Sequence, residues 1–368
     1  MSADSDARWV RESLGLVLER VAVTREAVGD RFPLYADPVD GGWTTTRRGS
    51  WTGGFWAGLL WLRARATGDA DDRRAAAGCT DALAGWVEAD TVTRGLILWY
   101  GTGLDERASA AARLRERAGG ALLAAFDPGL GLVPWGAALG GDRLLARTDG
   151  LPGTGRLLAC AGAAGARAAT AHLDRHLELC LPGDAMDPVR PAWRSRPGGW
   201  QPCEEPRPGW SRGEAWLLLA LADALSAPEE APARVASAAG RLADRLLAGP
   251  LVPPADAGRD GGPPDTSAAA IGAVALLKLA RARPGSPLAG AARYERRAVD
   301  VLRRLTDHHL SRPEHGRQGG GRPPAGMLLD GCYDADRGLA VRHELVWGDF
   351  FLALGLAALT GLADPSSV

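Results

Sequence analysis

Apolar residues recur along this chain at spacings of three and four residues, the period of an amphipathic helix. The alternation of apolar and polar residues that is typical of a half-buried strand is missing, and isoleucine, which favours strands, occurs only at Ile97 and Ile271. The pattern therefore predicts an all-α protein of about twelve helices and no strand. The predicted helices cover residues 7–28, 53–67, 73–89, 94–104, 107–125, 150–167, 168–181, 212–226, 232–248, 265–283, 288–309 and 345–361.

Clusters of proline and glycine separate the predicted helices and end regular structure. These clusters occur at residues 128–129, 197–199, 253–254, 261–264 and 319–321. None of them resembles a long linker between domains, so we expect a single domain over residues 1–368 with a short flexible N-terminus. Short and long connections alternate between paired helices, a pattern typical of an α/α toroid whose long loops gather at one mouth.

Composition and charge narrow the range of partners. The 368 residues are 46% hydrophobic, enough to bury a large core, and the formal net charge of -1 does not favour a nucleic acid or an anionic membrane surface. The first six residues are acidic and polar, unlike a secretion signal, and no later uncharged run is long enough to span a bilayer. We expect a cytoplasmic protein with a small-molecule or oligosaccharide partner; the oligomeric state stays open.

The cysteines and histidines do not form a recognisable metal site. The five cysteines are an odd number without a C-x-x-C pair, which predicts reduced, mostly buried thiols rather than a disulfide framework or a zinc site. His172 and His176 share a helix face without a third ligand at a suitable spacing, so we interpret them as part of a solvated face. His343 and Glu344 either reach a substrate or tether a loop.

Tryptophan dominates the aromatic residues, with 13 Trp against 5 Phe and 4 Tyr. The flat indole suits the apolar face of a sugar ring, whereas its N–H group makes it a costly core residue. Several predicted helix starts place indole rings or charges beside exposed backbone N–H groups, at residues 51–56, 210–216, 265–268 and 347–350. These starts predict a sugar cleft. Packing explains any one Trp equally well, and helix capping does so for Asp265.

Five segments carry a more specific signal through their order along the chain. They are Asp30-Arg31-Phe32-Pro33, the run 51–62 that Thr67-Gly68-Asp69 closes, Arg212-Gly213-Glu214-Ala215-Trp216, residues 265–271 and Val346-Trp347-Gly348-Asp349-Phe350. Together they resemble the unsaturated glucuronyl hydrolases of glycoside hydrolase family 88. The resemblance implies a single (α/α)6 barrel with no metal or organic cofactor. It also implies a cytoplasmic enzyme for oligosaccharides that carry a Δ4,5-unsaturated uronic acid at the non-reducing end.

The resemblance places the family's catalytic acid and base at Asp149. In the implied reaction this carboxyl group protonates C4 of the enol ether and activates the water that adds at C5, after which the hemiketal opens and expels the aglycone. Such an acid must hold a proton near neutral pH, which indole walls with little water would favour. From the residues alone, Asp149 is equally a helix cap or a partner of Arg147 or Arg156. A carboxylate locked by Arg147 would argue against catalysis.

A set of substrate contacts also follows from the resemblance. The predicted contacts are Trp51, Thr93, Trp135, Gln201, Arg212, Trp216 and Trp347. Among them, Arg212 is a natural partner for a uronate carboxylate or the hydroxyls beside it. The alternative is that Arg212 ties the barrel together through Glu214 or Asp349.

Three positions depart from the family's pattern. Thr93 stands where the family has a second catalytic-site aspartate, so a like-charged neighbour that helps the acid to keep its proton is lost. Gln201 is a shifted remnant of a His-Gln pair, and Gly153 replaces an asparagine one turn beyond Asp149. Three hypotheses follow: a hydrolase of unsaturated uronyl oligosaccharides, a divergent enzyme for another unsaturated or glycosylated small molecule, or a sugar-binding derivative without turnover.

Overall fold

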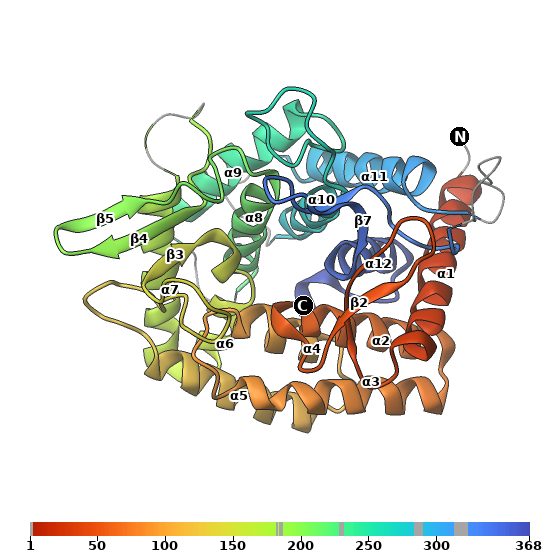
Figure 1. The fold of residues 1–368 in the computed structure, drawn as a ribbon, viewed down its shortest axis with the longest axis horizontal. Helices are drawn as coiled ribbons and strands as arrows, with labels where there is room; N and C mark the ends of the chain where they lie inside the picture. Colours follow the sequence, from red (N-terminus) through yellow and green to blue (C-terminus); the bar gives the residue numbers. More distant parts are fainter. Residues whose placement is uncertain (1–2, 182, 184–186, 228–231, 283–289, 313–322) are drawn as a thin grey trace.

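Most of the described chain is helical. The computed structural model describes residues 3–181, 183, 187–227, 232–282, 290–312 and 323–368 (Figure 1). Within these residues the α-helices are α1 (Ala3–Val28), α2 (Gly53–Thr67), α3 (Ala70–Ala82), α4 (Tyr100–Gly103), α5 (Ala108–Ala124), α6 (Thr154–Ala159), α7 (Gly162–Cys180), α8 (Ser211–Leu225), α9 (Ala233–Ala248), α10 (Thr266–Ala280), α11 (Ala291–His308) and α12 (Val346–Thr360). The prediction of a predominantly helical protein is confirmed. Helix α1 begins at Ala3, so the predicted flexible N-terminus is left to residues 1–2, outside the described residues.

Two predicted helix assignments need correction. The helices predicted for residues 150–167 and 168–181 divide instead at Gly162, the first residue of α7, whose φ of 74° lies in the left-handed region that favours glycine. The helix predicted for residues 94–104 begins as a π-helical turn, Gly95–Trp99, and α4 continues it. Both corrections concern the segments that bring Thr93 and Asp149 into place.

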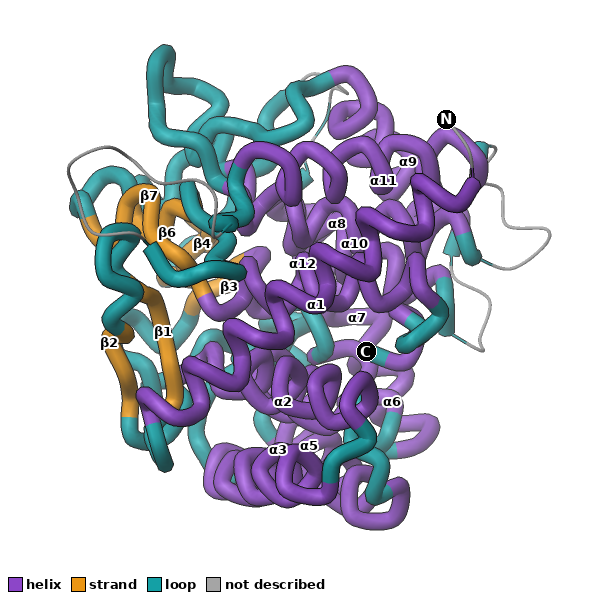
Figure 2. Tube along the Cα trace, turned by 90° about the vertical axis from the view of Figure 1, so that its right-hand side faces the viewer, coloured by secondary structure: helices purple, strands orange, loops and turns teal. Residues whose placement is uncertain are grey.

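The prediction of no strand is wrong. Seven short strands occur in the described residues, namely β1 (Phe32–Ala36), β2 (Trp43–Thr46), β3 (Leu145–Arg147), β4 (Ala192–Arg196), β5 (Gly199–Pro202), β6 (Gly331–Asp334) and β7 (Leu339–Leu345). They pair in antiparallel order as β2-β1-β7-β6 and β3-β4-β5, and Figure 2 shows them along one side of the helical body. Strands this short leave too few positions for an alternating pattern to stand out.

The helices form an inner ring and an outer layer. Around the inner ring, each element contacts the next. Helix α2 contacts α4, α4 contacts the π-helical turn before it, and this turn contacts α6. The contacts then continue from α6 to α8, α10 and α12, and from α12 back to α2. Helices α10 and α12 are buried on almost every side, which explains why they are apolar all round. Three amphipathic helices cover the ring from outside: α1 packs against α12, α9 against α8, and α11 against α10. Helices at the inner ring therefore supply the core.

Aromatic side chains fill the centre of the ring. Phe55 of α2 stacks on Trp216 of α8 with ring centroids 6.0 Å apart and planes within 14°. Tyr100, Phe350 and Phe351 surround Phe55 with centroid distances of 5.2 to 5.5 Å. Edge and tilted contacts of this kind stabilise a packed core beyond the area that they bury. The packing fixes Trp216, whose ring reaches the cavity described below.

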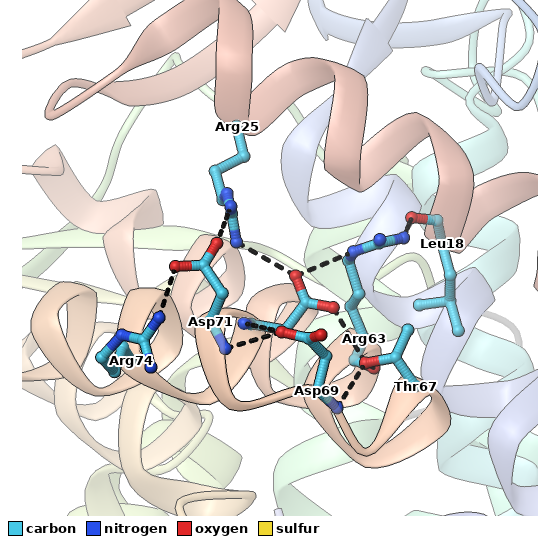
Figure 3. Close-up of polar contacts among 8 residues, drawn as sticks. Leu18, Arg25, Arg63, Thr67, Asp69, Asp71 and Arg74 are labelled. Atoms are coloured by element: carbon cyan, nitrogen blue, oxygen red, sulfur yellow. Dashed lines mark hydrogen bonds and ion pairs between the residues drawn. The ribbon is translucent and has the colours of Figure 1, made fainter.

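The Thr67-Gly68-Asp69 turn has a structural role, which Figure 3 shows in close-up. Gly68 ends α2 with a φ of 68°, and the Asp69 carboxylate caps α3 by accepting from the N–H groups of Asp71 (2.6 Å) and Asp72 (3.3 Å). Ion pairs to the first turn of α3 then tie it to α1 through Arg25 and to α2 through Arg63. No helix of the described ranges has both the length and the apolar character required to cross a membrane.

Candidate functional site

A cavity of about 980 Å³ opens among the strands β3 to β6, the loops beside them and the start of α8. Six of the eight predicted site residues line it: Trp51, Thr93, Trp135, Asp149, Arg212 and Trp216. Trp347 is buried behind Trp51, with ring centroids 4.8 Å apart, and Gln201 is exposed on β5; neither lines the cavity. The structure thus brings together three indoles, one acid and one arginine of the predicted set.

Asp149 lies in a short 3-10 turn, Thr148–Gly150, directly after β3, and is held by Arg147. The guanidinium donates from Nε to Oδ1 and from Nη2 to Oδ2, both at 2.9 Å. Burial lowers the pKa of Arg147 and pairing with Asp149 raises it, with a net upward shift. Because two donors occupy the carboxylate, Asp149 is not arranged as a proton donor in this state.

Arg147 has a second support, because its guanidinium packs over the ring of Trp135, 4.6 Å from the ring centroid. Of the partners that the sequence left open for Asp149, Arg147 is the correct one. Arg156 is engaged elsewhere, over the ring of Trp99 and with the carbonyl of Ser366. The observation that the sequence analysis set against catalysis, an Asp149 carboxylate in a salt bridge to Arg147, is therefore present.

Thr93 occupies a buried turn before the π-helical segment. Its hydroxyl shares a 2.8 Å hydrogen bond with the hydroxyl of Thr91. A hydroxyl group is uncharged, so Thr93 does not provide Asp149 with a negatively charged neighbour. The unusual stretch around Gly153 packs against the same turn. Gly153 has a φ of 73°, and a Cβ atom there would lie 2.5 Å from the carbonyl oxygen of Gly95. The glycine is required for this close approach of two backbone segments.

Arg212 is buried and acts as a cross-link. It pairs with Asp265 at the start of α10 and donates to the carbonyl oxygens of Cys332 and Tyr333 on β6. The expected partners Glu214 and Asp349 were wrong: Glu214 pairs with Arg245, and Asp349 lies beside Glu344.

The Asp265 carboxylate does more than pair with an arginine. It caps α10 by accepting from the N–H groups of Ser267 (3.0 Å) and Ala268 (3.4 Å). Arg212 therefore has the cross-linking role that was the alternative to substrate binding, but its partner is Asp265 at the start of α10. Because Arg212 also lines the cavity, this tie holds part of the cavity wall in place.

Three solved structures of unsaturated glucuronyl hydrolases share this fold. That of Bacillus sp. GL1, described as responsible for the degradation of glycosaminoglycan, is 22% identical, with a TM-score of 0.80 over 95% of this chain and 96% of that one. A structure with bound dGlcA-Glc-Rha-Glc is 23% identical (TM-score 0.81; 95% and 96%), and that from Streptococcus agalactiae is 18% identical (0.81; 98% and 94%). No protein-family profile and no curated protein matches the sequence. The chain has the fold of the unsaturated glucuronyl hydrolases.

The glucuronyl hydrolase fold here carries a charged cavity mouth that sequence reasoning missed. Six arginines line the cavity, and each is already paired with a carboxylate. Besides Arg147 and Arg212, they are Arg194 with Asp142, Arg207 and Arg259 with Asp336, and Arg337 with Glu205 and Asp334. Glu204, Asp256 and Tyr333 complete the mouth. These residues come from strands β4 and β6 and from separate loops and turns, and no local spacing signals their meeting.

The histidines and cysteines of this fold need two corrections and one confirmation. The prediction that His172 and His176 belong to a solvated helix face is wrong, because both are buried, with ring centroids 4.4 Å apart. Burial lowers the pKa of His176 to about 4. All five cysteines are free thiols, as predicted, but only Cys180 and Cys332 are buried, so the expectation of mostly buried thiols is wrong. Among the described residues, no three His, Cys, Asp or Glu side chains group as metal ligands would.

The segment before α12 is a tether in this structure. Glu344 is fully buried and accepts from both Nε and Nη2 of Arg20 on α1, the latter at 2.6 Å. His343 bonds the carbonyl oxygen of Val341 through Nδ1. Of the two roles left open for His343 and Glu344, the structural one is therefore confirmed for Glu344.

Proposed function

We propose that the protein hydrolyses oligosaccharides that end in a Δ4,5-unsaturated uronic acid, with Asp149 as acid and base. The scaffold would be a single (α/α)6 barrel over residues 1–368, in agreement with the ring of inner helices, and the enzyme would act in the cytoplasm without a cofactor. One observation carries the proposal: Asp149 shares a cavity of about 980 Å³ with Trp51, Trp135 and Trp216, in a fold that it has in common with glucuronyl hydrolases.

The proposed reaction is the hydration of an enol ether. The Asp149 carboxyl group gives its proton to C4, and positive charge develops at C5 and the ring oxygen. Water then adds its hydroxyl group at C5 and returns a proton to the Asp149 carboxylate. The hemiketal opens to a keto sugar acid and releases the aglycone as an alcohol. The indole walls of the cavity suit both the sugar ring and the exclusion of water.

The ion pair with Arg147 sets a condition on this proposal. Asp149 can carry a proton only when the guanidinium no longer occupies both carboxylate oxygens. The pair, together with the uncharged Thr93, favours a second candidate function, a sugar-binding protein without turnover. The rebuilt turn around Gly153 favours a third, an enzyme of the same fold for another unsaturated or glycosylated small molecule.

Absorbance of the conjugated enol provides the test. Purified protein is mixed with unsaturated disaccharides from several polysaccharide lyases, and the loss of ultraviolet absorbance is followed. We expect slow turnover that Asp149→Asn reduces by at least about 100-fold, the usual contribution of a general acid. Asp90→Asn, which breaks an exposed pair with Arg143, is the control and should keep full activity. Normal turnover by Asp149→Asn would refute the assignment, and binding without turnover by the wild type would support the second candidate.

A further inference from the structure

We propose that Arg147 is the receptor for the carboxylate of the substrate, and that this carboxylate takes over the guanidinium and frees Asp149 for proton transfer. The inference rests on the proposed function and adds to it a substrate-triggered step. It makes a negatively charged end group a requirement for turnover, beyond its contribution to binding. The supporting observations are the geometry of the pair, the state of the other arginines and the cost of separating charges.

The geometry keeps Arg147 in place while leaving Asp149 replaceable. Arg147 belongs to β3, where it pairs in register with Ala192 of β4, and its guanidinium lies over Trp135. Asp149 lies on a short turn, and within the described part of the chain its carboxylate accepts only from Arg147. A bidentate carboxylate site on a fixed guanidinium fits one planar carboxylate as well as another.

The other arginines of the cavity are poorer receptors. Arg212 is 4% exposed and is committed to Asp265 and two backbone carbonyls. The side chains of Arg194, Arg207, Arg259 and Arg337 at the mouth are 41 to 71% exposed, where water and salt weaken ion pairs. Arg147 is 24% exposed and lies against an indole, so it combines access for a substrate with partial exclusion of water.

Energetics favour exchange over simple opening. Pulling Asp149 away without a replacement would leave two partly buried charges without partners, which is unfavourable. When a substrate carboxylate replaces Asp149, the guanidinium keeps a bidentate partner throughout. The released Asp149 carboxylate then lies in a cavity walled by indoles and without its cation, conditions that favour binding of a proton from solvent. A neutral substrate cannot trigger this sequence, since it offers no charge to Arg147.

The experiment compares an unsaturated uronyl disaccharide with its C6 methyl ester. Wild-type enzyme should prefer the free acid by roughly 100-fold in kcat/KM, the scale of losing one partner of a desolvated charge pair. Arg147→Met should reduce that preference to less than about threefold by losing activity on the acid. Arg147→Lys, which keeps a charge but not the fork, should fall between the two. The control Arg143→Met removes a similar Arg–Asp pair outside the cavity and should leave the preference unchanged.

A binding assay that needs no turnover completes the test. In Asp149→Asn the competitor for Arg147 is weakened, so the free acid should bind at least about tenfold more tightly than to wild type, measured by quenching of indole fluorescence. The methyl ester should bind both proteins alike. An Arg147→Met enzyme that keeps the acid preference, or unchanged affinity in Asp149→Asn, would overturn the inference. A wild type that turns over neither compound would refute the proposed function instead, while the binding assay still decides the role of Arg147.

Discussion

Two arginine–aspartate pairs meet the same cavity and are built in opposite ways. Arg212 and Asp265 are 4% and 0% exposed, and each has further partners: backbone carbonyls on β6 for the arginine and the first turn of α10 for the aspartate. Arg147 and Asp149 are 24% and 16% exposed, and the aspartate has no such further hydrogen bonds among the described residues. The first pair belongs to the scaffold, and the second is the pair that we propose to change partners.

The difference shows that the identity of a pair does not reveal its role. A buried pair with every remaining donor and acceptor engaged fixes a structure, because any change leaves an uncompensated charge. A pair of the same chemistry at a cavity wall, with one member on a short turn, is a ready site for an anion. The number of further hydrogen bonds around each pair therefore distinguishes the fixed pair from the pair that we propose to be exchangeable.

The largest expected effect comes from Asp265→Asn. Asparagine still caps α10, so the change removes mainly the partner of the buried Arg212. We expect a loss of about 3–5 kcal/mol in the free energy of unfolding, measured by denaturant titration. Asp149→Asn should cost about 1 kcal/mol or less, since its pair is partly exposed. Equal losses in the two variants would contradict the division into a scaffold pair and an exchangeable pair.

Asp349, a buried acid near Arg20, tests whether a nearby arginine always keeps an acid charged. Burial raises the pKa of Asp349, and the neighbouring Glu344, which holds Arg20, raises it further. The folded protein therefore keeps a proton on Asp349 that the unfolded chain loses above its ordinary pKa of 3.8. Stability should fall as pH rises from about 4 toward the raised pKa of the folded state, because the unfolded chain binds fewer protons.

Asp349→Asn removes this proton and should flatten the dependence of the unfolding free energy on pH. Asp330→Asn is the matched control of opposite sign. A hydrogen bond from His309 lowers the pKa of Asp330, so its contribution is present above its ordinary pKa and is lost as pH falls through the lowered one. The two variants should therefore change the slope in opposite directions. An unchanged slope in Asp349→Asn would show that this acid is ionised in the folded protein.

The sequence predicted the helices well because a helix that is buried on one side has apolar residues every three or four positions, which can be seen in the local sequence. Helix α2, predicted at 53–67, begins and ends as expected, with Gly68 ending it. The strands escaped because three to seven residues are too few to show alternation. The inner ring and the strand-bearing side depend on contacts between distant segments, which no local pattern carries.

The resemblance to a known family, by motif or by position, predicted part of the cavity lining. The resemblance placed the catalytic acid at Asp149, which lines the cavity, and Arg147, two positions earlier, was among the partners considered. The Arg212–Asp265 pair joins residues 53 positions apart, and the cavity mouth joins several loops, so neither leaves a local signal. The burial of His172 was missed because its contact, the N–H of Val133 at 3.2 Å, comes from a loop 39 residues earlier.

The last predicted effect is a gain in turnover, from Thr93→Asp. A carboxylate at this position would line the cavity, offer Arg147 a second partner and place a like charge near Asp149, which favours the protonated form. Turnover of unsaturated disaccharides should rise by roughly tenfold, about 1.4 kcal/mol, although burial of the new charge should lower the thermal midpoint. Thr93→Val, which loses the hydroxyl without adding charge, should give no gain. A Thr93→Asp enzyme that folds but is no faster would show that the cavity has been rebuilt for a different substrate, with Arg147 and Asp149 then serving to bind it.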